Sequence, residues 1–292
     1  MEQPIIQLTQ LQRQLDKVTI IKSITAQVNA GDVVALLGKN GAGKTTLLET
    51  LLGFAFPSSG SATIWNKNAT EIQGDIKQRI GFVPQQSELL PNLTGKAHVE
   101  LFKAFRSTWN QVLVDKLIFE WLIPMDLFVG KMSVGQQQKL SILLAIAHEP
   151  ELLILDEPVA SLDPVARRQF LQQLIDIAAD PKRAIIFSSH IVSDMERIAN
   201  QVWMLQNGEL SYQGGLDELK ESIARITLHA EENLPADLQL PNTIKQRIQV
   251  KQAVVTVKNW QPELLENIEQ QFNARAQVEF LSLEDIFLEL NS

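Results

Sequence analysis

A glycine-rich segment, GKNGAGKT at residues 38–45, contains the residue types that bind a phosphate chain. It fits the pattern G-x-x-x-x-G-K-[ST], with an apolar run typical of a strand before it and helical spacing after it. Glycines let successive backbone N–H groups turn inward around phosphate oxygens, and the helix N-terminus adds positive potential. The residues expected to contact nucleotide phosphates are Gly38, Lys39, Asn40, Gly41, Ala42, Gly43, Lys44, Thr45 and Thr46.

Lys44 and Thr45 have the most specific expected roles in this segment. Lys44 is predicted to reach the β- and γ-phosphates of a nucleotide, and the Thr45 hydroxyl to bind Mg²⁺. The alternative is an ordinary glycine-rich turn into a helix. A lysine in the first helical turn argues against that alternative, because the helix dipole disfavours a cation there unless an anion is bound.

Two acidic residues follow an apolar run in the segment ELLILDEP, residues 151–158. A fully apolar strand is typical of the centre of a parallel sheet, and the carboxyl end of such a strand opens onto the crevice where ligands bind. Asp156 is therefore expected to orient Mg²⁺, directly or through water, and Glu157 to polarise the attacking water as a general base. A solvated pair of acids at a strand end is the alternative, and the phosphate-binding segment disfavours it.

A third segment, KMSVGQQQK at residues 131–139, combines a serine and a glycine with a glutamine-rich helix start. Ser133 and Gln136 are three residues apart, as in a capping box. A capped helix start with a glycine in its first turn, here Gly135, is also suited to bind an anion. The sequence therefore predicts a second place for a phosphate group.

Strands and helices that alternate along the chain must position these residues. Apolar runs at 32–37, 152–157 and 184–190 are each followed by helical spacing, which predicts an α/β fold with a parallel sheet. Residues 96–128 also have helical spacing. Asn207-Gly208 stands between two alternating segments and predicts a β-hairpin.

The pattern changes after Lys220. Residues 221–292 contain six Lys or Arg and eleven Asp or Glu, a net charge of −5, and they alternate strand-like runs with an amphipathic helix. Ser282 is expected to cap a last short helix. This segment is predicted to be a small separate α+β module.

Length and composition limit the classes of protein that remain. The chain has 292 residues, 45% of them hydrophobic and 21% charged, as in globular proteins. Without cysteine it has no disulfide framework. It lacks the basic start and apolar run of a signal peptide and any apolar stretch of about 18 residues. The net charge of −8 disfavours a general role in nucleic-acid binding, so a soluble protein of the cytoplasm is expected.

The order of the phosphate-binding segment and five later motifs resembles the ATP-binding subunit of an ABC transporter over residues 3–220. The later motifs are GFVPQQ, MSVGQ, LLILDEP, SLDP and SSH. The resemblance implies a P-loop NTPase fold with a RecA-like parallel sheet core, an antiparallel β subdomain and an inserted helical subdomain at about 86–148. It divides the chain into an ATP-binding domain, residues 1–220, and a C-terminal accessory, regulatory or dimerisation domain, residues 221–292.

In that family two chains enclose two ATP molecules head to tail, and the resemblance carries this expectation to the matching residues. It implies that Ser133, Gly135 and Gln136 contact the ATP held by the other ATPase subunit, which is either a second copy of the chain, in a homodimer, or a related ATPase. It also implies that Ser161–Asp163 cross the interface between the copies, with Asp163 close to the bound nucleotide.

The same resemblance assigns two further residues to the reaction. Gln85 is expected to contact Mg²⁺ and the γ-phosphate and to link them to a membrane partner. His190 is expected to contact the γ-phosphate. Taken alone, a histidine at a strand end is more often a structural residue, and only the series of motifs gives it a functional interpretation.

Two departures from the family pattern stand out. Met132 and Val134 replace the leucine and the glycine usual in the signature Leu-Ser-Gly-Gly-Gln, while Gly135 keeps the close approach of the backbone. The family also stacks adenine on an aromatic residue near the position of Leu15, and the first aromatic residue of this chain is Phe54. Adenine is therefore expected to rest on an aliphatic surface.

The ending SLEDIFLEL resembles the close of a subgroup of these ATPases that pair with separate permease subunits, often for efflux. The expected protein hydrolyses ATP, with ATP and Mg²⁺ as ligands. Its expected partners are a transmembrane permease and a second ATPase subunit, without nucleic acid. The expected location is the cytoplasmic face of the inner or plasma membrane. A tail that serves only stability or dimerisation is the alternative for residues 221–292.

Two other functions compete with this one. A non-transport ABC protein that acts on ribosomes or DNA usually has two cassettes in one chain or long coiled coils, and neither is present. A GTPase-type switch is expected to contain Asn-Lys-x-Asp, and the nearest match, NKNA at 66–69, lacks the acid.

Overall fold

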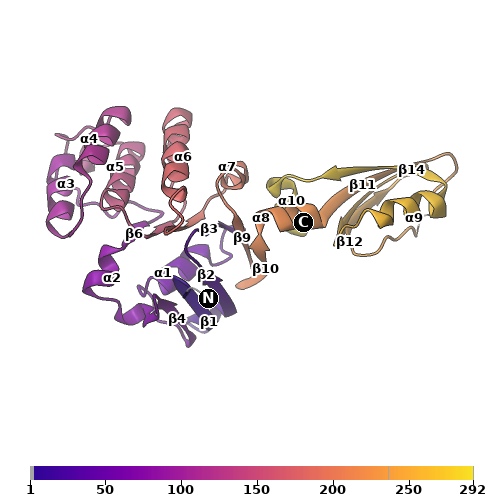
Figure 1. The fold of residues 1–292 in the computed structure, drawn as a ribbon, viewed down its shortest axis with the longest axis horizontal. Helices are drawn as coiled ribbons and strands as arrows, with labels where there is room; N and C mark the ends of the chain where they lie inside the picture. The colour runs from indigo at the N-terminus through magenta and orange to yellow at the C-terminus, as the bar shows by residue number, and fades with distance from the viewer. Residues whose placement is uncertain (1–2, 236, 292) are drawn as a thin grey trace. The chain divides into compact units, whose positions relative to one another are not determined.

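The chain forms two compact units (Figure 1). The computed structural model describes residues 3–235 and 237–291. The first unit ends at Gln213 and the second begins at Gly214, a few residues before the change of pattern after Lys220. Each unit has its own hydrophobic core.

The first unit contains strands, α-helices and short 3-10 helices. In chain order they are β1 (Ile6–Leu15), β2 (Val18–Val28), β3 (Val33–Leu37), α1 (Lys44–Leu51), β4 (Ser59–Ile64), β5 (Lys67–Asn68), η1 (Ala69–Glu71), α2 (Gly74–Gln78), β6 (Ile80–Val83), α3 (Gly95–Ala104), α4 (Gln111–Glu120), η2 (Val129–Lys131), α5 (Val134–Ile146), β7 (Leu152–Leu155), α6 (Pro164–Ala178), β8 (Ala184–Ser188), α7 (Val192–Glu196), β9 (Gln201–Gln206) and β10 (Glu209–Gly215).

A sheet at the centre of the first unit has, in the described part of the chain, the strand order β10-β9-β3-β8-β7-β6. Neighbours from β9 to β6 pair in parallel. β3, β7 and β8 are buried along their whole length, which explains their continuous apolar sequences. β10 follows β9 through Asn207 and Gly208, whose φ angles of 51° and 81° fit a type I′ turn. The predicted parallel sheet and hairpin are both confirmed.

The three buried strands bring the candidate residues together. Because β3, β8 and β7 are parallel neighbours, the segments after them meet at one edge of the sheet. The phosphate-binding segment follows β3, Asp156 and Glu157 follow β7, and His190 follows β8.

A second, antiparallel sheet has the order β2-β1-β4-β5. α1 contributes Leu47, Leu48 and Leu51 to one core cluster that includes Ile6 of β1 and Ile186 of β8, so both sheets pack against this helix. Each fully buried aliphatic side chain contributes about 1.5–3 kcal/mol. This packing holds the N-terminus of α1 at the edge where the candidate residues meet.

The helices α3, α4 and α5 lie together at one end of the first unit (Figure 1). The helical structure predicted for residues 96–128 is confirmed for α3 and α4, but residues 105–110 and 121–128 are not helical. α4 begins after Asn110, whose side chain accepts a hydrogen bond of 2.9 Å from Leu113 N, and it ends just before Leu122, whose φ is 53°. Across the described ranges, no helix combines the length and the apolar character needed to cross a membrane.

The second unit is an α+β structure, as predicted. Its elements are α8 (Leu216–Ser222), β11 (Ile223–Ala230), β12 (Thr243–Ile248), β13 (Gln252–Lys258), α9 (Glu263–Phe272), β14 (Ala274–Phe280) and α10 (Leu283–Asn291). The strands form an antiparallel sheet in the order β12-β13-β11-β14. Ser282 Oγ accepts a hydrogen bond of 3.1 Å from Asp285 N at the start of α10, so the predicted cap is confirmed.

Candidate functional site

The phosphate-binding segment forms a tight loop between β3 and α1. Gly41 and Gly43 have φ angles of 78° and 104°, which L side chains rarely adopt. A Cβ added at Gly38 would lie 2.7 Å from the carbonyl oxygen of Leu205 in β9, so glycine is required for packing. Gly43 is the N-cap of α1 and provides no side-chain cap. The first N–H groups of α1 are thus available to an anion.

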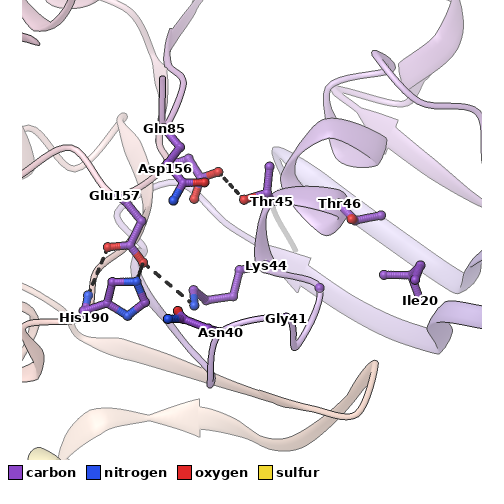
Figure 2. Close-up of a pocket in the computed structure, with 11 residues that line it drawn as sticks. Ile20, Asn40, Gly41, Lys44, Thr45, Thr46, Gln85, Asp156, Glu157 and His190 are labelled. Atoms are coloured by element: carbon purple, nitrogen blue, oxygen red, sulfur yellow. Dashed lines mark hydrogen bonds and ion pairs between the residues drawn. The ribbon is translucent and has the colours of Figure 1, made fainter. Parts of the chain in front are cut away.

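Lys44, the first residue of α1, is buried, with 8% of its side chain exposed. Its Nζ donates a hydrogen bond of 2.8 Å to Gly38 O and lies 3.8 Å from Glu157 Oε1. The ammonium group is therefore held over the loop, beside the general-base candidate. Figure 2 shows the two side chains pointing toward each other.

Asp156 is fixed through both of its carboxylate oxygens. Thr45 Oγ1 donates a hydrogen bond of 2.6 Å to Oδ2, and Ser188 Oγ donates one of 2.6 Å to Oδ1. Ser188 Oγ also accepts a hydrogen bond of 2.9 Å from Glu157 N. Sequence reasoning did not single out Ser188, although it begins the SSH motif. This serine couples the ends of β7 and β8.

Glu157 is buried, with 4% of its side chain exposed, and its φ of 50° lies in the left-handed region. His190 N donates a hydrogen bond of 3.1 Å to Oε2, and His190 Nε2 lies 3.2 Å from Oε1. Within the described residues Oε1 has ion-pair neighbours but no aligned hydrogen bond. Burial raises the pKa of Glu157, while the charges of His190 and Lys44 oppose the rise. A carboxylate with one oxygen that accepts no aligned hydrogen bond suits a base that must accept a proton.

These groups line one cleft of about 310 Å³. Gln85, predicted from its motif, lines the cleft, and so does Ile20 of β2, which sequence reasoning missed. Figure 2 shows Ile20 on the far side of the loop from Glu157. The remaining lining residues are Asn40, Gly41, Gly43, Lys44, Thr45, Thr46, Asp156, Glu157 and His190.

The residues of this cleft fit Mg²⁺ and a nucleotide triphosphate. Hydroxyl, carboxylate and amide oxygens, here from Thr45, Asp156 and Gln85, are the ligands that Mg²⁺ prefers. Lys44 and the start of α1 supply positive charge and N–H groups for phosphate oxygens. Ile20 adds an aliphatic side chain to the lining of the cleft.

The residues of the third motif lie outside this cleft. Ser133 is the N-cap of α5 and forms the predicted capping box: Ser133 N donates to Gln136 Oε1 (2.9 Å), and Gln136 N donates to Ser133 Oγ (3.3 Å). None of Ser133, Gly135 and Gln136 lines the cleft, and Val134 beside them is 67% exposed. Within one chain, the structure does not bring the two predicted phosphate sites together.

The loop before α6 lies against this motif. A Cβ added at Gly135 would lie 2.9 Å from Ser161 O. Asp163 is the N-cap of α6 and accepts hydrogen bonds of 3.0 Å from Val165 N and Ala166 N, which lower its pKa, that of Ala166 most. The predicted interface loop and the motif therefore form one surface of the chain.

An apolar cleft of about 230 Å³, missed by sequence reasoning, lies among α2, β6, α3 and α5. It is lined by Leu52, Phe54, Ile72, Lys77, Ile80, Phe82, Phe102, Arg106, Leu144 and Ala145. A further hollow of about 240 Å³ shares Phe54 and Phe82 with it and shares Gln85 with the first cleft. Gln85 therefore stands between the phosphate-binding residues and an apolar surface.

Comparison with known proteins agrees with this geometry. A family model described as ABC transporter matches residues 21–160. The chain is 30% identical over 225 residues to the ABC transporter ATP-binding protein YtrB of Bacillus subtilis (strain 168). The matched region covers 76% of each chain. It is 30% identical over 225 residues to the bacitracin transport ATP-binding protein BcrA of Enterococcus faecalis, covering 76% of this chain and 73% of BcrA. A solved structure of an ATP binding subunit of an ABC transporter matches with a TM-score of 0.67 and 27% identity, over 74% of this chain and 92% of that one. The predicted P-loop NTPase fold is confirmed.

Proposed function

The chain belongs to the ABC transporter family as an ATP-binding, ATP-hydrolysing subunit, and from this premise we propose that it powers a separate transmembrane permease in an exporter. A relative named for bacitracin transport supports a role in transport, and the resemblance of the ending SLEDIFLEL supports export. In this proposal the chain works at the cytoplasmic face of the membrane and is held there by the permease. Residues 214–292 are an accessory domain.

The arrangement of the first cleft supports specific roles in ATP hydrolysis. Glu157 accepts a proton from the attacking water, and His190 orients the Glu157 carboxylate through the contacts at 3.1 and 3.2 Å. Lys44 places positive charge on the transferred phosphate. Thr45, with Asp156 and Gln85 around it, would hold Mg²⁺, which neutralises charge on the phosphate oxygens.

The observation that carries the proposal is the separation of two anion-binding helix starts. α1 opens into the cleft, whereas α5, capped by Ser133, starts on a different surface together with Ser161 and Asp163. A second copy of the chain, turned head to tail, would bring its α5 start to the first copy's cleft. Two copies would then complete two sites, as closed twofold symmetry requires.

Mixing two inactive variants tests this sharing. Lys44→Ala removes the ammonium group of the cleft, and Gly135→Asp places a carboxylate where a phosphate would approach. Heterodimers contain one site with both partners intact, so the mixture should hydrolyse ATP faster than either variant alone. Each variant is first checked for unchanged thermal unfolding, because a side chain at Gly135 crowds Ser161 O. A mixture as inactive as its components contradicts a shared site in which one intact half suffices.

The apolar cleft beside Gln85 is the surface we propose for the permease. Phe102 lines it, and Phe54 at its rim is 65% exposed. Motion of Gln85 with the bound phosphate would reach this surface through Phe82. Phe102→Ser should abolish co-purification of a permease while ATP turnover of the purified chain persists. Phe119→Ser, at a residue 80% exposed on α4, is the matched control and should change neither.

Purification of the tagged chain from its own cells in mild detergent tests the transporter assignment directly. The expected result is one polytopic membrane protein in a stoichiometric amount, identified by mass spectrometry. Ribosomal proteins or DNA-associated proteins in place of a membrane protein would contradict the proposal and favour a non-transport role.

A further inference from the structure

The second unit sorts its charges between the two faces of its sheet. α9 packs on one face, where Ile268 joins a core with Ile226 and Val255 of the strands. The first turn of α9 carries Glu263 and Glu266, both exposed to solvent. This side of the unit is therefore acidic.

The opposite face of the sheet is basic. The strand registers place on it every Lys and Arg of β11 to β14, namely Arg225, Lys245, Arg247, Lys258 and Arg275. Alternation along each strand explains this placement, because residues two apart point to the same face. The unit, residues 214–292, has a net charge of −6, yet one of its surfaces carries the opposite sign.

Part of this face is neutralised within the unit. Glu289 of α10 accepts a hydrogen bond of 2.9 Å from Arg225 and lies 3.4 Å from Lys245 Nζ. Arg225 also pairs with Glu279 at 3.5 Å. These cations are held by acids of their own unit.

The part of this face that lies away from α10 has no such acids. Arg247 and Arg275 are exposed, and across the described residues neither has an ion pair or a side-chain hydrogen bond. Cross-strand pairing places Thr227 and Gln277 in the same row as Arg247, and His229 in the same row as Arg275. Neither row contains a carboxylate. Two forked donors and several hydrogen-bonding groups are thus left without partners on one sheet surface.

We propose that this basic face, the sheet surface that carries Arg247, Thr227, His229, Gln277 and Arg275, binds an acidic polypeptide segment of a partner protein. The two arginines stand on the outer strands β12 and β14, three strand spacings or about 14 Å apart across the sheet, and their rows are two residues or about 7 Å apart along it, which makes about 16 Å in all. An extended peptide that crosses the strands spans this distance in about five residues. Carboxylates at that spacing would each meet one guanidinium in a bidentate pair.

Charge and symmetry disfavour the other occupants of such a surface. Single-stranded nucleic acid binds through stacked aromatic side chains, and these rows contain no Phe, Tyr or Trp. An anionic membrane or a nucleic-acid duplex is an extended polyanion. Its field would also repel the acidic side chains of this unit that lie within a Debye length, about 8 Å, of its surface. A second copy would pair its acidic α9 side with this face. Because the two surfaces lie on opposite faces of the sheet, that contact would stack head to tail without closing.

Site-specific photo-crosslinking of the full-length chain in its own cells tests the proposal. A benzophenone amino acid at Gln277 probes the basic face, and the same probe at exposed Gln270 on α9 is the control. The expected product joins Gln277 to a net acidic segment of another protein. Its yield should fall about tenfold in Arg247→Glu/Arg275→Glu, since attraction becomes repulsion at two sites.

Adducts at Gln277 with this chain itself, with lipid or with nucleic acid would overturn the proposal. So would no adduct, an adduct equally formed from Gln270, or one insensitive to the arginine reversals. Reversal of two exposed lysines of the first unit, Lys67→Glu/Lys182→Glu, makes the same change in net charge and should leave the yield unaltered.

Binding to purified protein supplies a second readout. Fluorescence anisotropy of a labelled peptide of about 16 residues, alternating Glu and Thr, should show saturable binding to the full chain. A Gln-Thr peptide is the uncharged control. Arg247→Glu/Arg275→Glu should weaken binding about tenfold while ATP turnover and thermal unfolding stay as in the parent chain. Tighter arginine-dependent binding to phosphatidylglycerol vesicles or to single-stranded DNA would overturn the choice of a polypeptide.

Discussion

Replacing Glu157 by glutamine tests the chemistry of the first cleft most directly. Glutamine keeps the size of the side chain and removes its ability to accept a proton. A positioned general base contributes about 10²–10⁴-fold to rate, or about 2.7–5.4 kcal/mol. Among the described residues that line the cleft, the other acid is Asp156, and hydroxyl donors occupy both of its oxygens. With no second base in place, the loss of turnover should lie near the upper end of that range.

The assay measures steady-state phosphate release and, separately, ATP binding and size by light scattering. Glu157→Gln should bind ATP within a few-fold of the parent chain and accumulate as an ATP-bound dimer. Glu49→Gln is the matched control, because Glu49 lines the neighbouring hollow and is exposed. Its turnover should change less than about twofold. Turnover of Glu157→Gln close to that of the parent chain would remove Glu157 from the mechanism.

Three further predictions concern the first unit. Glu157 must be ionised to act as a base, and burial raises its pKa, so the acid limb of the pH–rate profile should lie above pH 4.5. His190→Gln removes a charge that lowers the pKa of Glu157, so this variant should move the acid limb to higher pH. An acid limb that does not move would show that His190 does not affect the base. Leu15 is 55% exposed at the end of a hairpin, and Leu15→Tyr adds an aromatic ring there. The variant should bind ATP about threefold to tenfold more tightly without binding inorganic triphosphate more tightly. Competition with a fluorescent nucleotide measures both affinities. Arg79→Ala should lower the free energy of unfolding by about 1–3 kcal/mol in urea titrations. The reason is that the Arg79 guanidinium donates hydrogen bonds of 2.7 and 2.6 Å to Glu151 and lies over the Trp65 ring at 3.7 Å. A change below about 0.5 kcal/mol would contradict this expectation.

Sequence reasoning succeeded where the physical requirement is local. The glycines of the loop, the capping box of Ser133 and Gln136 and the Asn207-Gly208 turn each depend on residues a few positions apart, and the structure confirms their conformations. The buried strands can also be predicted from the sequence, because burial on both faces of a strand requires a continuous apolar run.

Residues that act through the pairing of distant segments were not readable in the same way. Ser188 matters because β7 and β8 are neighbours, which places its hydroxyl between Asp156 and the backbone of Glu157. Ile20 reaches the cleft only because β2 packs beside the loop, where a Cβ at Gly43 would lie 3.3 Å from its side chain. The apolar cleft and the basic face likewise depend on tertiary packing and strand register.

The contacts around Lys44 explain how ATP itself would control the base. In the structure, Lys44 Nζ is shared between Gly38 O at 2.8 Å and Glu157 Oε1 at 3.8 Å, and the Lys44 and Glu157 side chains are buried. A phosphate that enters the loop competes for the same ammonium group with more than one negative charge. Glu157 then loses a cation that lowers its pKa, so its carboxylate becomes a stronger proton acceptor when substrate is present. If this coupling operates, Lys44→Met should raise the pKa of Glu157 in the nucleotide-free chain, and ¹³C NMR of a labelled Glu157 carboxyl would detect the shift. An unchanged pKa would show that the 3.8 Å pair has no electrostatic weight and that the base is set by burial and His190 alone.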